Sequence, residues 1–145
     1  ADRETIEKRR RLVENTREDV RQIIDVAGID DPEQIDIVVT PEWKHEALNV
    51  AIESDAPNVI PALMERESIK RHGDDAASYG QQLQENRKAL QRTLDPETER
   101  KALEAAAWLI EREFDAEVRV LSADETSKEM TNEAEPSRPA IDITE

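Results

Sequence analysis

Residues 35–42 predict an abrupt change from strand to helix, and this change constrains the fold more than any other feature of the sequence. The segment Ile35–Val39 is short and rich in β-branched residues, which favours a strand. Thr40 stands where a helix N-cap belongs, and Pro41 occupies the first helical position, where its missing N–H costs nothing. Glu42 then places a negative charge near the positive end of the helix dipole. We therefore expect the strand to turn into a helix within two residues.

The helix expected from residue 41 to residue 54 has one apolar face, which carries Trp43, Ala47, Val50 and Ala51. We expect this face to cover the strand that precedes it, with Trp43 as the core residue that joins the helix to the sheet. The alternative is an exposed Trp43 with a role in stacking.

Helix and strand patterns alternate along the chain and predict an α+β fold. Apolar residues that recur every seven positions predict one long N-terminal helix from Arg3 to Ala27, and Gly28 ends it. The expected strands are 35–39, 117–121 and 140–143, and the further helices are 58–68, 74–93, 95–114 and, as a short helix or an ordered loop, 125–132. The helix 95–114 begins with Asp95 as its cap and Pro96 after it, as the helix from residue 41 begins with Thr40 and Pro41. These elements indicate a small three-stranded sheet covered by helices on one face. An all-helical bundle with frayed ends is the alternative.

The net charge of −15 is the strongest signal in the composition, with 35 Asp and Glu residues against 20 Lys and Arg residues. Such a surplus destabilises a compact state by self-repulsion unless salt screens it. Aromatic residues make up only 3% of the chain, as in many disordered acidic proteins, but the clear apolar periods oppose disorder. Arginine outnumbers lysine among the basic residues. The composition therefore favours a folded protein from a halophile.

The residue types that catalysis and metal binding require are scarce. Cysteine is absent, and the two histidines, His45 and His72, lack the spacing of metal ligands. The three glycines form no phosphate-binding loop, and no serine has a plausible base partner in the sequence. We therefore expect no catalytic residue, no metal site and no cofactor in this chain.

No apolar run approaches the ~20 residues that span a bilayer. The N-terminal residues Ala1–Glu4 are polar, lack a secretory pattern and look like a cut within a helix. We expect a cytoplasmic protein without a membrane partner.

Three stretches of the sequence resemble one family. They are Val-Val-Thr-Pro-Glu-Trp-Lys at 38–44, Ile-Lys-Arg-His-Gly at 69–73, and Arg-Pro-Ala-Ile-Asp-Ile-Thr-Glu at 138–145. In this order they resemble the C-terminal region of archaeal- and eukaryotic-type leucyl-tRNA synthetases, and together they span most of the chain. The acidic composition then points to a haloarchaeal source. The last stretch departs from the family pattern at Asp142, in an acidic direction.

The resemblance implies a division of the chain and a role for each part. Residues 1–28 would be the last helix of an anticodon-binding bundle, and residues 29–145 a C-terminal domain without an active site. In this family that domain docks on tRNA-Leu and helps to recognise its long variable arm. Aminoacylation, which consumes ATP, and editing occur in other domains. The implied partners are tRNA-Leu and the remaining domains of the synthetase.

Two other classes of function stay open. One is a free-standing acidic protein-interaction module of a halophile, and the other is a purely structural brace within a larger enzyme.

The candidates for contact with RNA are basic residues, most of them within the family-like stretches. They are Lys44, Lys70, Arg71, His72, Arg119 and Arg138. The connector 69–73 is the strongest of these, because it is expected to be a loop and is locally positive. A solvated surface role is the alternative for each.

Two further features allow two interpretations each. The basic cluster 8–11 either pairs with Glu4, Glu7 and Glu14 along the long helix or contacts phosphate. Trp108 lies off the apolar stripe of its helix. We favour a helix buried on two sides, and the alternative is an exposed face on which a base stacks.

The charge surplus predicts that folding strengthens with salt. Raising potassium chloride from dilute buffer to molar levels should raise the melting temperature, because screening removes like-charge repulsion. Thermal melts followed by circular dichroism across a salt series measure this. A melting temperature that stays flat or falls would contradict the halophile interpretation.

Overall fold

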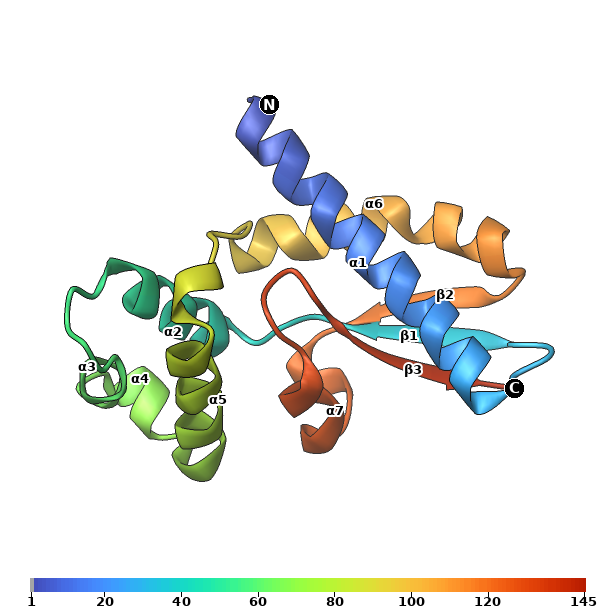
Figure 1. The fold of residues 1–145 in the computed structure, drawn as a ribbon. Coiled ribbons are helices and arrows are strands. Elements are labelled where there is room, and N and C mark those ends of the chain that lie inside the picture. Colours follow the sequence, from blue (N-terminus) through green and yellow to red (C-terminus); the bar gives the residue numbers. More distant parts are fainter. Residues whose placement is uncertain (1) are drawn as a thin grey trace. The chain divides into compact units, whose positions relative to one another are not determined.

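The computed structural model describes residues 2–145, and its helices and strands follow the expected order (Figure 1). The elements are α1 (Arg3–Ala27), β1 (Gln34–Val38), α2 (Glu42–Glu53), α3 (Ile60–Met64), α4 (Glu67–Lys70), α5 (Gly73–Glu85), η1 (Arg87–Ala89), α6 (Pro96–Phe114), β2 (Glu117–Leu121), η2 (Ala123–Glu125), α7 (Lys128–Glu133) and β3 (Ala140–Thr144). The α+β prediction is confirmed, and the all-helical alternative is wrong.

The three strands form one mixed sheet in the order β2-β1-β3. β1 runs parallel to β2 and antiparallel to β3. In this register Ile37 lies opposite Val120 on one side and Ile141 on the other. Since side chains alternate along a strand, two apolar residues of each strand lie on the same face: Ile35 and Ile37, Val118 and Val120, and Ile141 and Ile143.

That apolar face is covered by α1 and α6. Leu12 and Val20 of α1 and Leu103 and Ile110 of α6 belong to one buried cluster with Ile35 and Ile37 of β1. The helices therefore cover the sheet as expected. The opposite face is largely polar, and α7 packs against only one end of it, around Val38 and Ala140.

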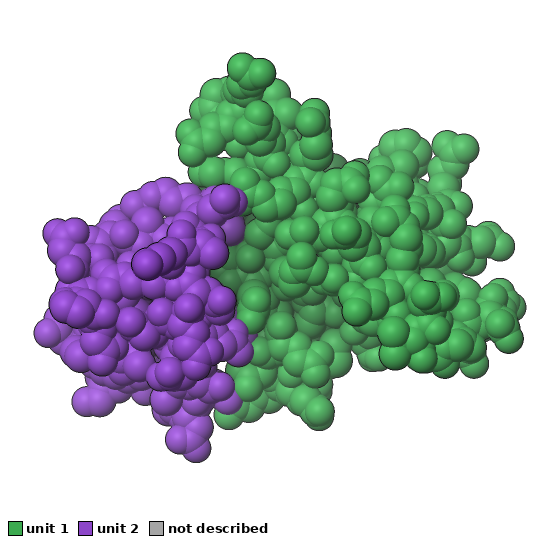
Figure 2. All heavy atoms as spheres, viewed as in Figure 1, with its two compact units in different colours: residues 1–41, 94–145 green, residues 42–93 purple. Residues whose placement is uncertain are grey.

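The chain forms two compact units (Figure 2). Unit 1 contains the sheet with α1, α6 and α7, and comprises the chain up to Pro41 together with 94–145. Unit 2 is 42–93, which is inserted between β1 and α6 and contains α2 to α5. Unit 2 has its own core, in which Leu63, Ile69 and Leu83 are almost fully buried.

Helix α2 does not cover the sheet, contrary to the prediction. Its apolar residues Trp43, Ala47 and Ala51 belong to the core of unit 2, together with residues of α3, α4 and α5. The sheet already has two long helices on its apolar face, so the apolar surface of α2 is buried by its own neighbours in sequence instead.

Two helix boundaries differ from the prediction because local geometry intervenes. The expected helix 58–68 is split into α3 and α4, since Arg66 between them takes an extended backbone with ψ 114°. The expected helix 74–93 ends at Glu85, and Asn86 covers its end by donating from Nδ2 to the carbonyl of Gln82 at 2.9 Å.

The two predicted caps have different outcomes. Asp95 caps α6 as expected, because its Oδ1 accepts the Thr98 N–H at 2.9 Å. These bonds to Thr98 lower the pKa of Asp95. Thr40 does not cap α2. The helix begins at Glu42, and the Thr40 hydroxyl has no hydrogen-bond partner among residues 2–145.

An ion cluster joins α1 to α6. Glu113 of α6 accepts from Arg17 Nε at 2.6 Å and from Arg21 Nε at 2.8 Å. Partial burial of the Glu113 carboxyl would raise its pKa, but the two guanidinium donors outweigh this effect and hold the pKa below its ordinary value. The cluster therefore favours the folded state whenever Glu113 is ionised.

This cluster predicts a pH-dependent contribution to stability. Because the pKa of Glu113 is lowered in the folded state, its contribution is present above the unfolded-state pKa and is lost as pH falls through the folded-state pKa. Glu113→Gln should cost about 1 kcal/mol at neutral pH, as a well-formed surface network does. Urea titrations of both proteins at fixed salt, from neutral to acidic pH, should show the two stabilities converging.

The matched control is Glu104→Gln, which removes an equal charge from the same helix. Glu104 is exposed and lies 3.9 Å from Arg100, so its loss should change the free energy of unfolding very little at any pH. Equal costs for the two substitutions would mean that the cluster contributes nothing specific.

Candidate nucleic-acid interface

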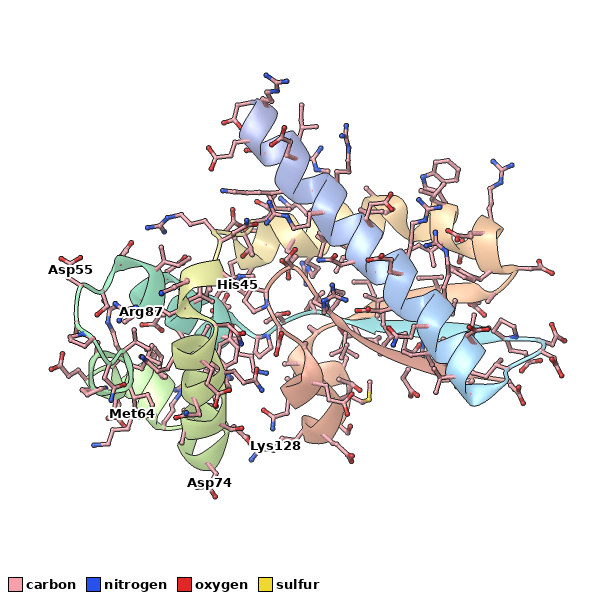
Figure 3. The ribbon with its side chains drawn as sticks, in the orientation of Figure 1. His45, Asp55, Met64, Asp74, Arg87 and Lys128 are labelled. Atoms are coloured by element: carbon pink, nitrogen blue, oxygen red, sulfur yellow. The ribbon has the colours of Figure 1, made fainter. Side chains whose placement is uncertain are left out.

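The connector 69–73 lies in unit 2 and is not the loop that we expected throughout, because it comprises the end of α4, the turn Arg71-His72 and the first residue of α5. Lys70 is the last residue of α4, and Arg71 follows as its C-cap. Gly73 then takes φ +55°, a left-handed conformation that glycine adopts without strain, and begins α5. Asp74, labelled in Figure 3, marks the first turn of that helix. The chain therefore turns sharply at the point where the two cations stand.

Lys70 and Arg71 are exposed, and their side chains make no ion pair or hydrogen bond with any residue that the structure describes. In a chain with a net charge of −15, these two adjacent cations have no carboxylate partner among residues 2–145. They can approach a phosphate without first breaking an internal ion pair.

His72 is held by the core of unit 2 rather than left free in the connector. Its ring stacks on Trp43, with the ring centroids 4.5 Å apart and the planes at 16°. Trp43 in turn meets Tyr79 edge to face at 5.9 Å. The three rings attach the connector to α2 and α5, so His72 positions Lys70 and Arg71.

Lys44 is buried next to the same rings. Its Nζ lies 5.0 Å from the centroid of Tyr79 and 5.7 Å from that of Trp43, which are cation–π distances. The family-like sequence at 38–44 therefore places an aromatic ring and a cation in the core, and Lys44 presents no exposed charge to a partner.

The other two candidates belong to unit 1 and have internal ion pairs. Arg119 donates to both carboxylate oxygens of Asp36, at 2.9 and 3.0 Å, on the polar face of the sheet. Arg138 donates to Asp19 at 2.5 Å. A phosphate would have to displace these carboxylates, so the connector is the better candidate.

The basic cluster 8–11 of α1 fits ion pairing for one residue and leaves contact with phosphate open for the other three. Lys8 pairs with Glu4 at 3.2 Å, as expected for a solvated helical turn. The side chains of Arg9, Arg10 and Arg11 form no ion pair within residues 2–145. Contact of these three arginines with phosphate stays a prediction.

Trp108 is 57% exposed, so the expectation that α6 is buried on two sides is wrong. The helix packs in unit 1 through the stripe that contains Leu103 and Ile110, and Trp108 lies off this stripe. The guanidinium of Arg112 lies 6.0 Å from its ring centroid.

Two further residues stabilise unit 2 and lie outside the expected connector. Tyr79 completes the ring cluster, and the only signal for it was its place among the apolar positions of a weak helical pattern. Arg87, labelled in Figure 3, donates to the carbonyls of Ser54, at 2.5 Å, and Ala56, and so fixes the loop before α3. Nothing in the sequence distinguishes Arg87 from a solvated cation.

Among residues 2–145 no group of three His, Asp or Glu side chains is arranged to hold a metal ion. No helix in this part of the chain has both the length and the apolar character needed to cross a membrane.

Comparisons with known proteins point to one family. No family model matches the chain. The chain is 46% identical over 134 residues to the leucine–tRNA ligase of Halobacterium salinarum, which covers 92% of this chain and 15% of that protein. It is 30% identical over 143 residues to the leucine–tRNA ligase of Pyrococcus horikoshii, a match that covers 97% of this chain and 14% of that protein. It is 32% identical over 143 residues to the leucine–tRNA ligase of Methanococcus maripaludis, a match that covers 95% of this chain and 14% of that protein. The match lies in a C-terminal part of these proteins. The chain thus spans only about 15% of the length of the relatives it matches.

Because Trp43 is buried among rings and Trp108 is exposed, we expect their replacement by alanine to change the free energy of unfolding very differently. Trp43→Ala should cost roughly 3–5 kcal/mol, as large-to-alanine changes in cores do, and should unfold unit 2 first. Trp108→Ala, the matched control on an exposed helix face, should change stability by no more than about 0.5 kcal/mol. Urea titrations in molar potassium chloride compare the two. Equal costs would contradict the burial of Trp43.

Proposed function

Because the chain belongs to the leucine–tRNA ligase family, matching a C-terminal part of its members, we propose that it is the non-catalytic tRNA-binding part of a synthetase that joins leucine to tRNA-Leu with consumption of ATP. Residues 29–145 help to bind tRNA-Leu, through its long variable arm. Residues 1–28 belong to the end of the anticodon-binding bundle. The remaining domains of the synthetase supply the active site, and the parent protein acts in the cytoplasm of a halophilic archaeon.

The unpaired cations of the connector are the observation that carries this proposal to particular residues. Lys70 and Arg71 are exposed, adjacent and without internal partners among residues 2–145. His72 and Gly73 fix the direction of the chain beside them. An unpaired arm tip presents both phosphates and base edges to such a loop.

The acidic surface limits how much of the binding comes from phosphate contacts. Two cations on a single strand would give log K a slope of about −1.4 against log salt, much shallower than for a basic RNA-binding protein. Most of the preference for tRNA-Leu must then come from base-edge hydrogen bonds, stacking and shape.

The first test removes the proposed domain from the full-length enzyme. Deleting residues 29–145 should sharply lower leucylation efficiency at high salt while leaving leucine-dependent ATP–pyrophosphate exchange intact, because the chemistry occurs elsewhere. Shortening the variable arm of tRNA-Leu should cause a similar loss in the intact enzyme and little further loss in the truncated one. Equal losses from the short arm in both enzymes would show that the arm is recognised by another domain.

The second test separates the connector from a mere brace. Lys70→Ala with Arg71→Ala in the full-length enzyme should raise KM for tRNA-Leu several-fold, less than the deletion does, and leave the melting temperature unchanged. The matched control is Arg100→Ala with Lys101→Ala, an adjacent pair on α6 whose cations lie near Glu104 and Glu97. If both pairs change KM equally, the connector has no specific role.

A further inference from the structure

The exposed indole of Trp108 lies in a hollow of unit 1 that the tRNA-binding proposal does not use. The hollow has a volume of about 580 Å³ and is formed by the last turns of α6, the start of β2 and the loop before β1. The indole is 57% exposed, and tryptophan is enriched at protein interfaces because its ring combines a large apolar face with a polar N–H.

The contact between Trp108 and Arg112 indicates which chemistry the ring face accepts. The Arg112 guanidinium lies 6.0 Å from the ring centroid, within the range of cation–π attraction. Among residues 2–145, Arg112 makes no ion pair with a carboxylate. The contact of its guanidinium with the indole ring is therefore its only charge-dependent interaction in this part of the chain. An incoming guanidinium or ammonium could therefore replace it on the indole.

Five carboxylates line the hollow together with the indole. Asp31, Glu33, Glu111, Asp115 and Glu117 line the same hollow. Glu111 accepts the Val118 N–H at 3.1 Å, while the side chains of the other four make no ion pair or hydrogen bond with any residue the structure describes. A cation that enters the hollow therefore meets an aromatic face and five carboxylates, four of them without an ion pair, while Arg112 is the one cation among the lining residues.

Two other occupants fit these features less well. A second copy of the chain carries the same net charge of −15 and would be repelled, as would the phosphates of an RNA strand. An added β-strand would have to pair with the free edge of β2, but Glu111 already occupies the Val118 N–H.

We propose that this hollow docks an arginine-rich peptide segment of a protein partner, with one guanidinium stacked on Trp108 and its neighbours paired with the carboxylates. The docking is independent of the tRNA-binding connector in unit 2. The affinity for the peptide depends only partly on charge attraction, because the stacked guanidinium keeps its contact with the ring when salt screens the carboxylates.

The test measures binding of a fluorescein-labelled peptide of alternating glycine and arginine to the 145-residue chain by anisotropy in molar potassium chloride. Trp108→Ala should weaken binding about tenfold, as loss of a cation–π contact does. Arg112→Ala should strengthen binding about threefold, because it frees the ring face. Asp115→Asn should weaken it about twofold to threefold, and asparagine keeps the left-handed backbone of residue 115 (φ +51°).

Controls decide whether the site is specific. Glu104→Gln removes the same charge from α6 outside the hollow and should leave binding unchanged. Equal weakening by Glu104→Gln and Asp115→Asn would overturn the proposal in favour of diffuse charge attraction. No effect of Trp108→Ala would also overturn it. A labelled oligouridylate that binds more tightly than the peptide, depends on Trp108 and is weakened by Arg112→Ala would make the hollow a base-stacking site instead.

Discussion

The parallel pairing of β1 with β2 is the constraint on which the rest of the structure depends. Two parallel strands cannot be joined by a tight turn, so a long connection must leave one end of the sheet and return to the other. Here that connection contains all of unit 2 and then α6. The same pairing aligns Ile35 and Ile37 with the valines of β2, which creates the apolar face that α1 and α6 cover. The core of unit 1 and the long connection that contains unit 2 therefore both follow from one strand pair.

The sequence predicted those features that depend on neighbours along the chain. The strand 35–39 was expected within one residue of β1, because β-branched residues and a following proline are local signals. Gly28 and Asp95 were recognised for the same reason, since a helix end needs only its own residues. The packing partner of α2 was wrong, because an apolar helix face does not specify which of two apolar surfaces it will meet.

Prediction of the candidate site had the same limit. The connector was identified from its charge and glycine, both of which are local. Whether each cation has an internal carboxylate partner could not be predicted, because that depends on residues distant in sequence. Arg119 pairs with Asp36 on the neighbouring strand, and Arg138 pairs with Asp19 on α1. Lys44 looked like a surface cation and is enclosed by rings, one of which comes from α5. Trp108 was misjudged because a narrow apolar stripe fits both a helix with one buried side and a helix with two.

The insertion of unit 2 between β1 and α6 has a consequence for how such a chain can evolve. Every hydrogen bond of the sheet and the cap of α6 are made by residues outside 42–93. Substitutions, insertions or deletions in unit 2 therefore leave the strand register and the core of unit 1 unchanged, provided that its two ends still return to the same place. The unit that carries the connector is therefore free to change with the RNA partner that we propose, while the sheet and its two long helices remain under a separate selection for stability.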